Sequence, residues 1–167
     1  MIQKKILFVC LGNICRSPAA EGILKKILKE KGLNRSVEVD SAGTIAYHSG
    51  ELPDSRMIKH AAKRGYILDH IARKFNPSID FNSFDLIIPM DNQNYEDVIA
   101  SYKSGNPKSK VIKMTDFSSN KIYDEVPDPY DSDQRGFELV LDILEDACKN
   151  LADKIEDEII RINKKEN

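Results

Sequence analysis

Two residues that could do chemistry together, Cys10 and Arg16, stand near the start of the chain with five residues between them. An apolar segment, residues 5–9, precedes the cysteine, and a Ser-Pro pair at 17–18 follows the arginine. A loop that runs from a strand into a helix offers unpaired N–H groups and the positive end of the helix dipole to an anion. A thiol and an arginine in such a loop predict a site that binds a phosphate group and attacks it.

The residues between this cysteine and arginine suit a loop that wraps around an anion. Gly12 removes a side chain that would crowd the loop, and Asn13 adopts a left-handed conformation at lower cost than most residues. We expect successive N–H groups to form a concave nest, in which Arg16 grips two phosphate oxygens. The same positive field stabilises a thiolate at Cys10. The expected phosphate-binding residues of the loop are Leu11, Gly12, Asn13, Ile14, Cys15 and Ser17.

Displacing an alcohol or a phenol from phosphorus also requires an acid that protonates the leaving oxygen. Asp128 is the best candidate, because two prolines stiffen the segment 126–130 around it. An acidic surface loop is the alternative interpretation of this segment. A calcium loop is disfavoured, since the required glycine and terminal glutamate are missing. Other acids lie close to Asp128 in the sequence: Asp124, Glu125, Asp131 and Asp133.

The composition is that of an ordinary globular domain. The chain has 167 residues, of which 41% are hydrophobic and 31% charged, and its net charge is −2. We therefore expect one domain over residues 1–167 and no nucleic-acid partner. No apolar run reaches the length of a membrane helix and no signal peptide is recognised, so we expect no membrane partner. Three cysteines without disulfide or zinc spacing predict a reducing, cytoplasmic location and no metal site.

Apolar patterning predicts strands that alternate with helices. Residues 5–9 read as a strand buried on both faces, and residues 37–40 as a half-exposed edge strand. The first helix is expected over 18–31, with Ser17 as its N-cap, Pro18 in its first position and Gly32 at its C-terminal end. Such an order is typical of an α/β fold, in which ligands bind beyond the carboxyl ends of parallel strands.

The second half of the chain continues this alternation. A helix is expected from about residue 53 to Gly65, and strands over 86–88 and 111–112 follow, with a weakly helical segment over 91–102 between them. A long amphipathic helix begins at about Asp133, and Cys148 lies in its apolar stripe as a packed thiol. The inner face of the helix near residue 53 is expected to hold Met57, Ile58, Ala61 and Ala62.

The segment Val9–Pro18 resembles the signature loop of the low-molecular-weight protein tyrosine phosphatases. The similarity continues, in the family's order, through 39–44, 69–73, 90–91 and 128–130. It implies a single-domain, four-stranded parallel sheet with helices on both faces, the phosphate-binding loop after the first strand, and no cofactor. It also implies that the partners are tyrosine-phosphorylated proteins and, at the loop, inorganic phosphate, and that the protein is a monomer or a weak dimer.

The resemblance gives each catalytic residue a role. Cys10 attacks phosphorus and forms a phosphocysteine, Arg16 binds the equatorial oxygens, and Asp128 acts first as acid and then as base. Ser17 resembles a hydroxyl that hydrogen-bonds the nucleophile. Cys15 resembles a cysteine that forms a reversible disulfide with Cys10, although a passive loop residue is an equal alternative.

Further positions resemble residues that support the loop or contact the substrate. Asn13, Ser41 and His70 are expected to brace the loop by hydrogen bonds, and Asp91 is expected to orient that histidine. Tyr47 and Tyr130 match aromatic walls beside the phosphorylated ring, whereas the effect of His48 on specificity stays open. Ile14 favours phosphotyrosine, because bacterial relatives that act on phosphoarginine usually have threonine at this position.

Three other functions remain as alternatives. An arsenate reductase of this fold needs two further cysteines downstream, and only Cys148 is present after Cys15. A phosphocysteine carrier of a sugar transport system would leave Arg16 and Asp128 without clear roles. A phosphoryl-binding module without turnover is disfavoured, because a nucleophile, a clamp and an acid are all present. The sequence leaves the physiological substrate open.

Overall fold

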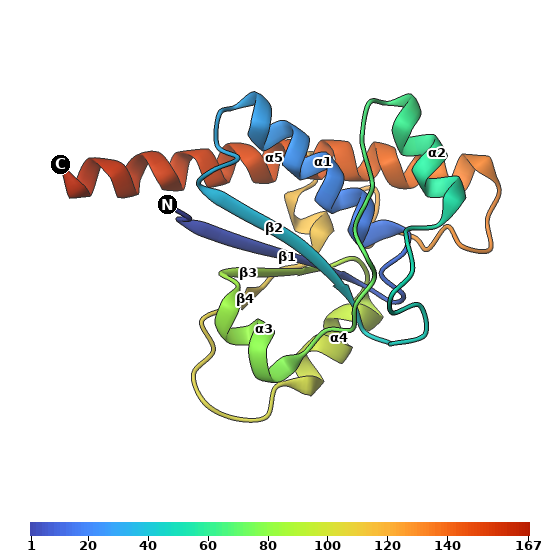
Figure 1. The fold of residues 1–167 in the computed structure, drawn as a ribbon, viewed down its shortest axis with the longest axis horizontal. Coiled ribbons are helices and arrows are strands. Elements are labelled where there is room, and N and C mark those ends of the chain that lie inside the picture. Colours follow the sequence, from blue (N-terminus) through green and yellow to red (C-terminus); the bar gives the residue numbers. More distant parts are fainter.

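Four parallel strands form one sheet in a computed structural model that describes residues 1–167. The strand order is β2-β1-β3-β4, so β1, which ends at Cys10, is an inner strand and β2 is an edge strand, as predicted (Figure 1). The expected fold class is confirmed. The strands are β1 (Lys4–Cys10), β2 (Val37–Gly43), β3 (Leu86–Pro89) and β4 (Lys110–Val111).

Helices cover both faces of this sheet. Helices α1, α2 and α5 lie on one side, and the shorter helices α3 and α4 lie on the other (Figure 1). The larger of two hydrophobic clusters, with 34 buried residues, fills the first side, and a cluster of eight fills the second. No helix combines the length and the apolar composition needed to cross a membrane. The helices are α1 (Arg16–Glu30), α2 (Ser55–Lys63), α3 (Pro77–Ser83), α4 (Asn92–Ser101), α5 (Gln134–Glu166) and the 3-10 helix η1 (Met114–Phe117).

Strand β1 places Cys10 at the carboxyl end of the sheet, between two neighbouring strands. Residues 6–9 are fully buried, because the strand has neighbours on both sides and helices on both faces. The register pairs Cys10 with Gly43 on β2 and Val9 with Pro89 on β3. The cysteine therefore stands where the carboxyl ends of three strands meet.

Helix α1 begins at Arg16, two residues before the predicted start. Its N-cap is Cys15, which makes no side-chain capping bond, so the prediction of Ser17 as N-cap and Pro18 as first residue is wrong. The proline is tolerated because it still lies in the first turn, where N–H groups have no helical partner. The C-terminal end of the helix agrees with the prediction, since Gly32 lies just after it in the left-handed conformation, with φ 72°.

The other elements differ from the predictions in detail. On α2, Met57 and Ala61 are buried as predicted, and Ile58 is partly buried. Ala62 is exposed instead of buried, and the buried side chain that packs against α5 is His60. Strand β4 lies one residue earlier than predicted, and α3 and η1 were not predicted at all. Helix α5 follows its N-cap Asp133 as expected.

Candidate active site

The loop between β1 and α1 folds back over the sulfur of Cys10. The backbone N–H of Asn13 donates to Cys10 Sγ at 3.3 Å, and Ser17 Oγ lies 3.0 Å from the same sulfur. Asn13 takes the left-handed conformation expected from the sequence, with φ 59°. Because α1 starts directly at Arg16, the first N–H groups of this helix face the same centre as the loop.

The side chain of Asn13 ties the loop to two distant segments. Its Nδ2 donates to Ser17 Oγ at 2.8 Å and to Ser41 Oγ at 2.9 Å. Its Oδ1 accepts from the backbone N–H of Arg73 at 2.9 Å and lies 2.9 Å from His70 Nε2. All the hydrogen-bonding positions of this amide are used, and only 1% of the residue is exposed. The bend of the loop is therefore held by β2 and by the segment around His70.

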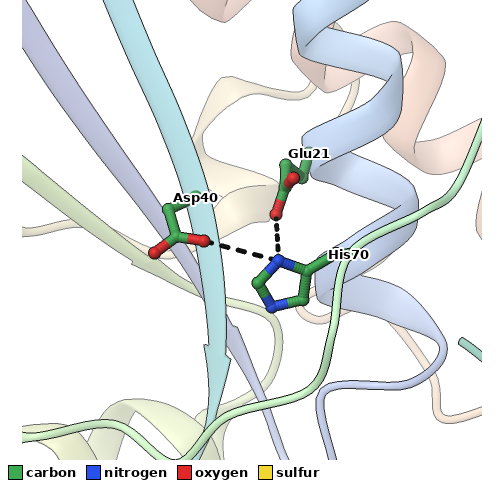
Figure 2. A group of neighbouring side chains, drawn as sticks. All are labelled: Glu21, Asp40 and His70. Carbon is green, nitrogen blue, oxygen red and sulfur yellow. Dashed lines mark ion pairs between the residues drawn. The ribbon is translucent and has the colours of Figure 1, made fainter. Parts of the chain in front are cut away.

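Next to this amide lies a partly buried cluster of ionisable side chains: Glu21, Asp40 and His70 (Figure 2). His70 Nδ1 faces Glu21 Oε1 at 3.2 Å and Asp40 Oδ1 at 3.4 Å. Ser41 Oγ donates to Glu21 Oε1 at 2.8 Å, which links the cluster to Asn13. Glu21 was missed in the sequence, although a charged residue beside the buried Ala20 and Ile23 of a helix was a signal for it.

Three potential metal ligands meet here, since the ligand atoms of Glu21, Asp40 and His70 lie within 4.8 Å of one another. Each already has protein partners: Lys25 pairs with the glutamate at 2.7 Å and Arg73 with the aspartate at 3.1 Å. The cluster is thus accounted for by ion pairs and hydrogen bonds that fix the ring of His70.

Asp91 does not orient His70, and that prediction is wrong. Its Oδ2 accepts from Arg16 Nη1 at 2.6 Å, and its Oδ1 caps helix α4 by accepting from the N–H of Asn94 at 2.7 Å. The physical reason is its position, because it follows β3 on the arginine side of the loop. The histidine instead uses the carboxylates of α1 and β2.

Arg16 is held at three points although it is almost fully buried. Besides Asp91, its Nη1 donates to the carbonyl oxygen of Val126 at 3.0 Å, and its Nη2 lies 3.4 Å from Asp128 Oδ2. Burial opposes its charge, but the charge of Cys10, the hydrogen bond to Asp91 and the charge of Asp128 outweigh burial and raise the pKa of Arg16. The guanidinium is therefore a fixed positive group beside the sulfur.

Cys10, Arg16 and Asp128 line one cavity of about 370 Å³, which we call the catalytic cavity. Asp128 is nearly half-exposed there, and its Oδ1 accepts from the N–H of Tyr130 at 3.1 Å. Of the neighbouring acids, Asp131 also lines the cavity. The loop residues that line it are Leu11, Gly12, Ile14 and Cys15, and the other lining residues are Ile45, Tyr47, His48 and Tyr130.

Aromatic side chains form the mouth of this cavity. Tyr47 is 83% exposed and Tyr130 is 46% exposed. The ring of His48 lies between them, with centroids 4.8 Å from Tyr47 and 6.1 Å from Tyr130, and its Nδ1 pairs with Glu51. Both predicted aromatic positions thus line the cavity, together with the ring of His48.

Cys15 differs from Cys10 in its surroundings. It is buried at the helix start, and burial, reinforced by the charge of Asp54, raises the pKa of Cys15 well above its ordinary value. All three cysteines are free, and Cys148 packs within α5, where its thiol faces the carbonyl oxygen of Ala20 at 3.7 Å. Cys15 is thus held as a neutral thiol.

One glycine lets β2 approach the loop. A Cβ added to Gly43 would lie 2.7 Å from the carbonyl oxygen of Leu11 and 3.1 Å from the backbone nitrogen of Asn13. Contacts this short with backbone atoms would displace the loop. The close fit depends on the missing side chain at this position.

An α/β sheet with a cysteine-arginine loop at the end of its central strand defines a phosphate-binding class of enzyme, and known proteins identify the family. Residues 5–161 match the profile of the family described as "Low molecular weight phosphotyrosine protein phosphatase". The chain belongs to this family, as its resemblance predicted.

Individual relatives match over most of their length. The low molecular weight phosphotyrosine protein phosphatase of Rattus norvegicus is 36% identical over 153 residues, which cover 91% of this chain and 96% of the rat protein. A crystal structure of the protein tyrosine phosphatase of Entamoeba histolytica is 48% identical, with a TM-score of 0.88, covering 93% of this chain and 98% of that one. An arginine phosphatase of Drosophila is 30% identical, with a TM-score of 0.84, covering 90% and 97%.

Proposed function

We propose that this protein hydrolyses phosphotyrosine in proteins, and small aryl phosphates, through a phosphocysteine intermediate and without a metal. The observation that carries the proposal is the meeting of Cys10, Arg16 and Asp128 around one cavity. The substrate phosphate lies in the loop, and its aryl ring lies against the aromatic side chains that line the cavity, Tyr47 and Tyr130. The protein works in the cytoplasm as a monomer or a weak dimer.

In the first step the thiolate of Cys10 attacks phosphorus opposite the leaving oxygen. The S–P bond forms and the P–O bond to the tyrosine breaks, while Asp128 gives its proton to the departing oxygen. The N–H of Asn13 and the hydroxyl of Ser17 both lie within hydrogen-bond distance of the sulfur. The tyrosine then leaves as a neutral phenol.

In the second step water hydrolyses the phosphocysteine. Asp128, now a carboxylate, takes a proton from the water as the water oxygen attacks phosphorus. The P–S bond breaks, phosphate is released and the thiolate of Cys10 is restored. In both steps the loop N–H groups and Arg16 bind the equatorial oxygens, where negative charge accumulates, and this replaces the role that a metal has in other phosphatases.

Phosphotyrosine is preferred over phosphoarginine as substrate. Two tyrosine rings at the mouth favour a flat aromatic ester. Ile14 lines the cavity, and an apolar side chain offers no hydrogen bond to a guanidinium. An arsenate reductase is disfavoured, because only Cys148 follows Cys15 and its thiol is fully buried between α5 and α1.

The test is hydrolysis of p-nitrophenyl phosphate by purified, reduced protein in the presence of EDTA, with Cys10→Ser as the matched variant. We expect turnover by the wild type. Cys10→Ser should lose turnover but retain phosphate binding, measured by calorimetry. Turnover that requires added metal, or a Cys10→Ser variant that stays active, would contradict the mechanism.

A second arm compares a phosphotyrosyl with a phosphoarginyl peptide of the same sequence. We expect the larger kcat/KM for phosphotyrosine. Wild-type protein that binds phosphate but turns over neither peptide would instead be a carrier or a binding module.

A further inference from the structure

A groove of about 410 Å³ lies next to the catalytic cavity, between helix α2 and the beginning of α5. Helix α2 contributes Arg56, Lys59, His60 and Lys63, and α5 contributes Phe137. These α2 positions are separated by three, one and three residues, so they lie on one face of the helix. We call this surface the basic groove.

Two of its four basic side chains have no acidic partner. Arg56 pairs with Asp54 at 2.8 Å, and His60 pairs with Glu138 at 3.1 Å. Lys59 and Lys63, by contrast, are exposed and lie within ion-pair distance of no carboxylate. The acid on the opposite wall, Asp133, already pairs with Arg135 at 2.8 Å. The groove therefore offers two free ammonium groups to an acidic ligand.

The walls of the groove are fixed before any ligand binds. Arg64, just after α2, donates to Asp142 at 2.8 Å and to Glu138 at 2.5 Å on α5. The ring of His60 stacks on Phe137 with centroids 5.7 Å apart and an interplanar angle of 7°. A groove that is already ordered loses little conformational entropy on binding.

One side chain of the basic groove contacts a residue that lines the catalytic cavity. Arg56 Nη2 donates to the carbonyl oxygen of Tyr130 at 3.0 Å, and its guanidinium lies 5.5 Å from the Tyr130 ring. Tyr130 lines the catalytic cavity and Arg56 lines the groove, so this contact joins the edges of the two hollows. A chain that places a phosphorylated side chain in the cavity and passes over Tyr130 would enter the groove.

We propose that the basic groove binds acidic residues of the substrate that flank the phosphotyrosine; this inference rests on the proposed function. The occupant is an extended, acidic peptide segment on one side of the phosphorylated residue. The α2 positions 56–63 span about 10 Å of helix, which matches about three residues of an extended chain. The complementary charge lies at Lys59 and Lys63.

The experiment measures kcat/KM for phosphotyrosyl peptides that differ only beside the phosphotyrosine. Two acidic peptides are used, one with three aspartates before the phosphotyrosine and one with three aspartates after it. Matched peptides carry alanine or lysine at the same positions. The test variant is Lys59→Glu/Lys63→Glu. The control is Lys164→Glu/Lys165→Glu, which makes the same change in net charge at exposed positions near the far end of α5 (Figure 1).

We expect the wild type to prefer the acidic peptide of one polarity over the alanine peptide by about three- to tenfold, the size expected for two exposed ion pairs. The preference should vanish or invert in Lys59→Glu/Lys63→Glu, persist in the control, and shrink as salt is added. Hydrolysis of p-nitrophenyl phosphate should be equal in all three proteins, which reports that each is folded.

Three results would overturn the inference. Equal kcat/KM for acidic and alanine peptides would remove the preference, and a preference that survives Lys59→Glu/Lys63→Glu would assign it to another surface. Sedimentation showing a wild-type dimer that this variant dissociates would assign the groove to a second copy of the chain. Failure of the proposed function looks different, because then no phosphotyrosyl peptide would be hydrolysed, whatever its flanks.

Discussion

The base of the catalytic loop and the mouth of the catalytic cavity are built in opposite ways. At the base, Asn13, Ser17 and Ser41 are buried, and the side chain of each is hydrogen-bonded to at least one of the others. At the mouth, Tyr47 and Tyr130 are exposed, and their rings contact His48 and, for Tyr130, Arg56. The hydrogen bonds at the base thus fix the shape of the loop, whereas the exposed rings at the mouth can change position when a substrate binds.

This difference predicts that substitutions at the base change both stability and kcat, while substitutions at the mouth change KM alone. Asp128 lies between the two, because it is partly exposed but points at Arg16. We expect the largest effect from substitution of Asp128, smaller effects at Asp91 and Asn13, and the smallest effect at Tyr47.

Asp128→Ala should have the largest effect on rate, a fall in kcat of about 10²–10⁴-fold, because no group then protonates the leaving oxygen. Its effect on the free energy of unfolding should be small. The control is an aryl phosphate whose phenol is more acidic, which needs less protonation and should be slowed less. An effect below tenfold would transfer the acid role to Asp131, which lines the same cavity.

Asp91→Asn should lower kcat/KM by about 10²-fold, because Arg16 loses the carboxylate that aims it and small misplacements are costly in catalysis. Asparagine still caps helix α4, so the comparison with Asp91→Ala separates two effects. In urea titrations, the free energy of unfolding of the alanine variant should be about 1 kcal/mol lower than that of the asparagine variant. Equal stability of the two would show that the cap contributes nothing.

Asn13→Gly tests the base itself. Glycine keeps the left-handed backbone but removes the amide that joins Ser17, Ser41, Arg73 and His70, so kcat should fall about tenfold and stability by about 1–3 kcal/mol. Asn13→Ala should cost about 1 kcal/mol more, because alanine is strained at φ 59°. Thermal unfolding of the pair measures this difference, and a more stable alanine variant would contradict the strain.

Tyr47→Ala should have the smallest effect. We expect KM for an aryl phosphate to rise about threefold through lost stacking, with kcat unchanged and stability within about 0.5 kcal/mol of the wild type. Alkyl phosphate hydrolysis, which gains nothing from stacking, serves as the control. A fall in kcat comparable to that of Asn13→Gly would erase the distinction between base and mouth.

Much of this architecture could be predicted from the sequence because its signals are local. Residue types and their spacing within short segments indicate three elements: the buried strand, the loop from Cys10 to Arg16 and the long helix after Asp133. The helix start at Arg16 could not be predicted, since it depends on how the loop closes around the sulfur. The sequence presents Ser17 and Pro18 as capping residues, while the fold places the serine hydroxyl 3.0 Å from the sulfur of Cys10.

Pairings between distant segments were beyond the reach of such local signals. Asp91 and His70 were each recognised, but which partner each one has is set by the sheet order. The carboxylates beside the histidine come from α1 and β2, as Glu21 and Asp40. The short helices α3 and η1 lack a full apolar repeat, and tertiary packing decides their conformation.

The bare backbone at Gly43 has a consequence for anyone who needs an inactive but folded form of this protein. A single methyl group there would act as a wedge behind the loop, pushing against the oxygen of Leu11 from the next strand. Every group that touches the substrate would keep its chemical identity, yet the anion nest would open. Although Gly43 has no side chain that could take part in the reaction, the absence of a Cβ at this position keeps the loop in shape.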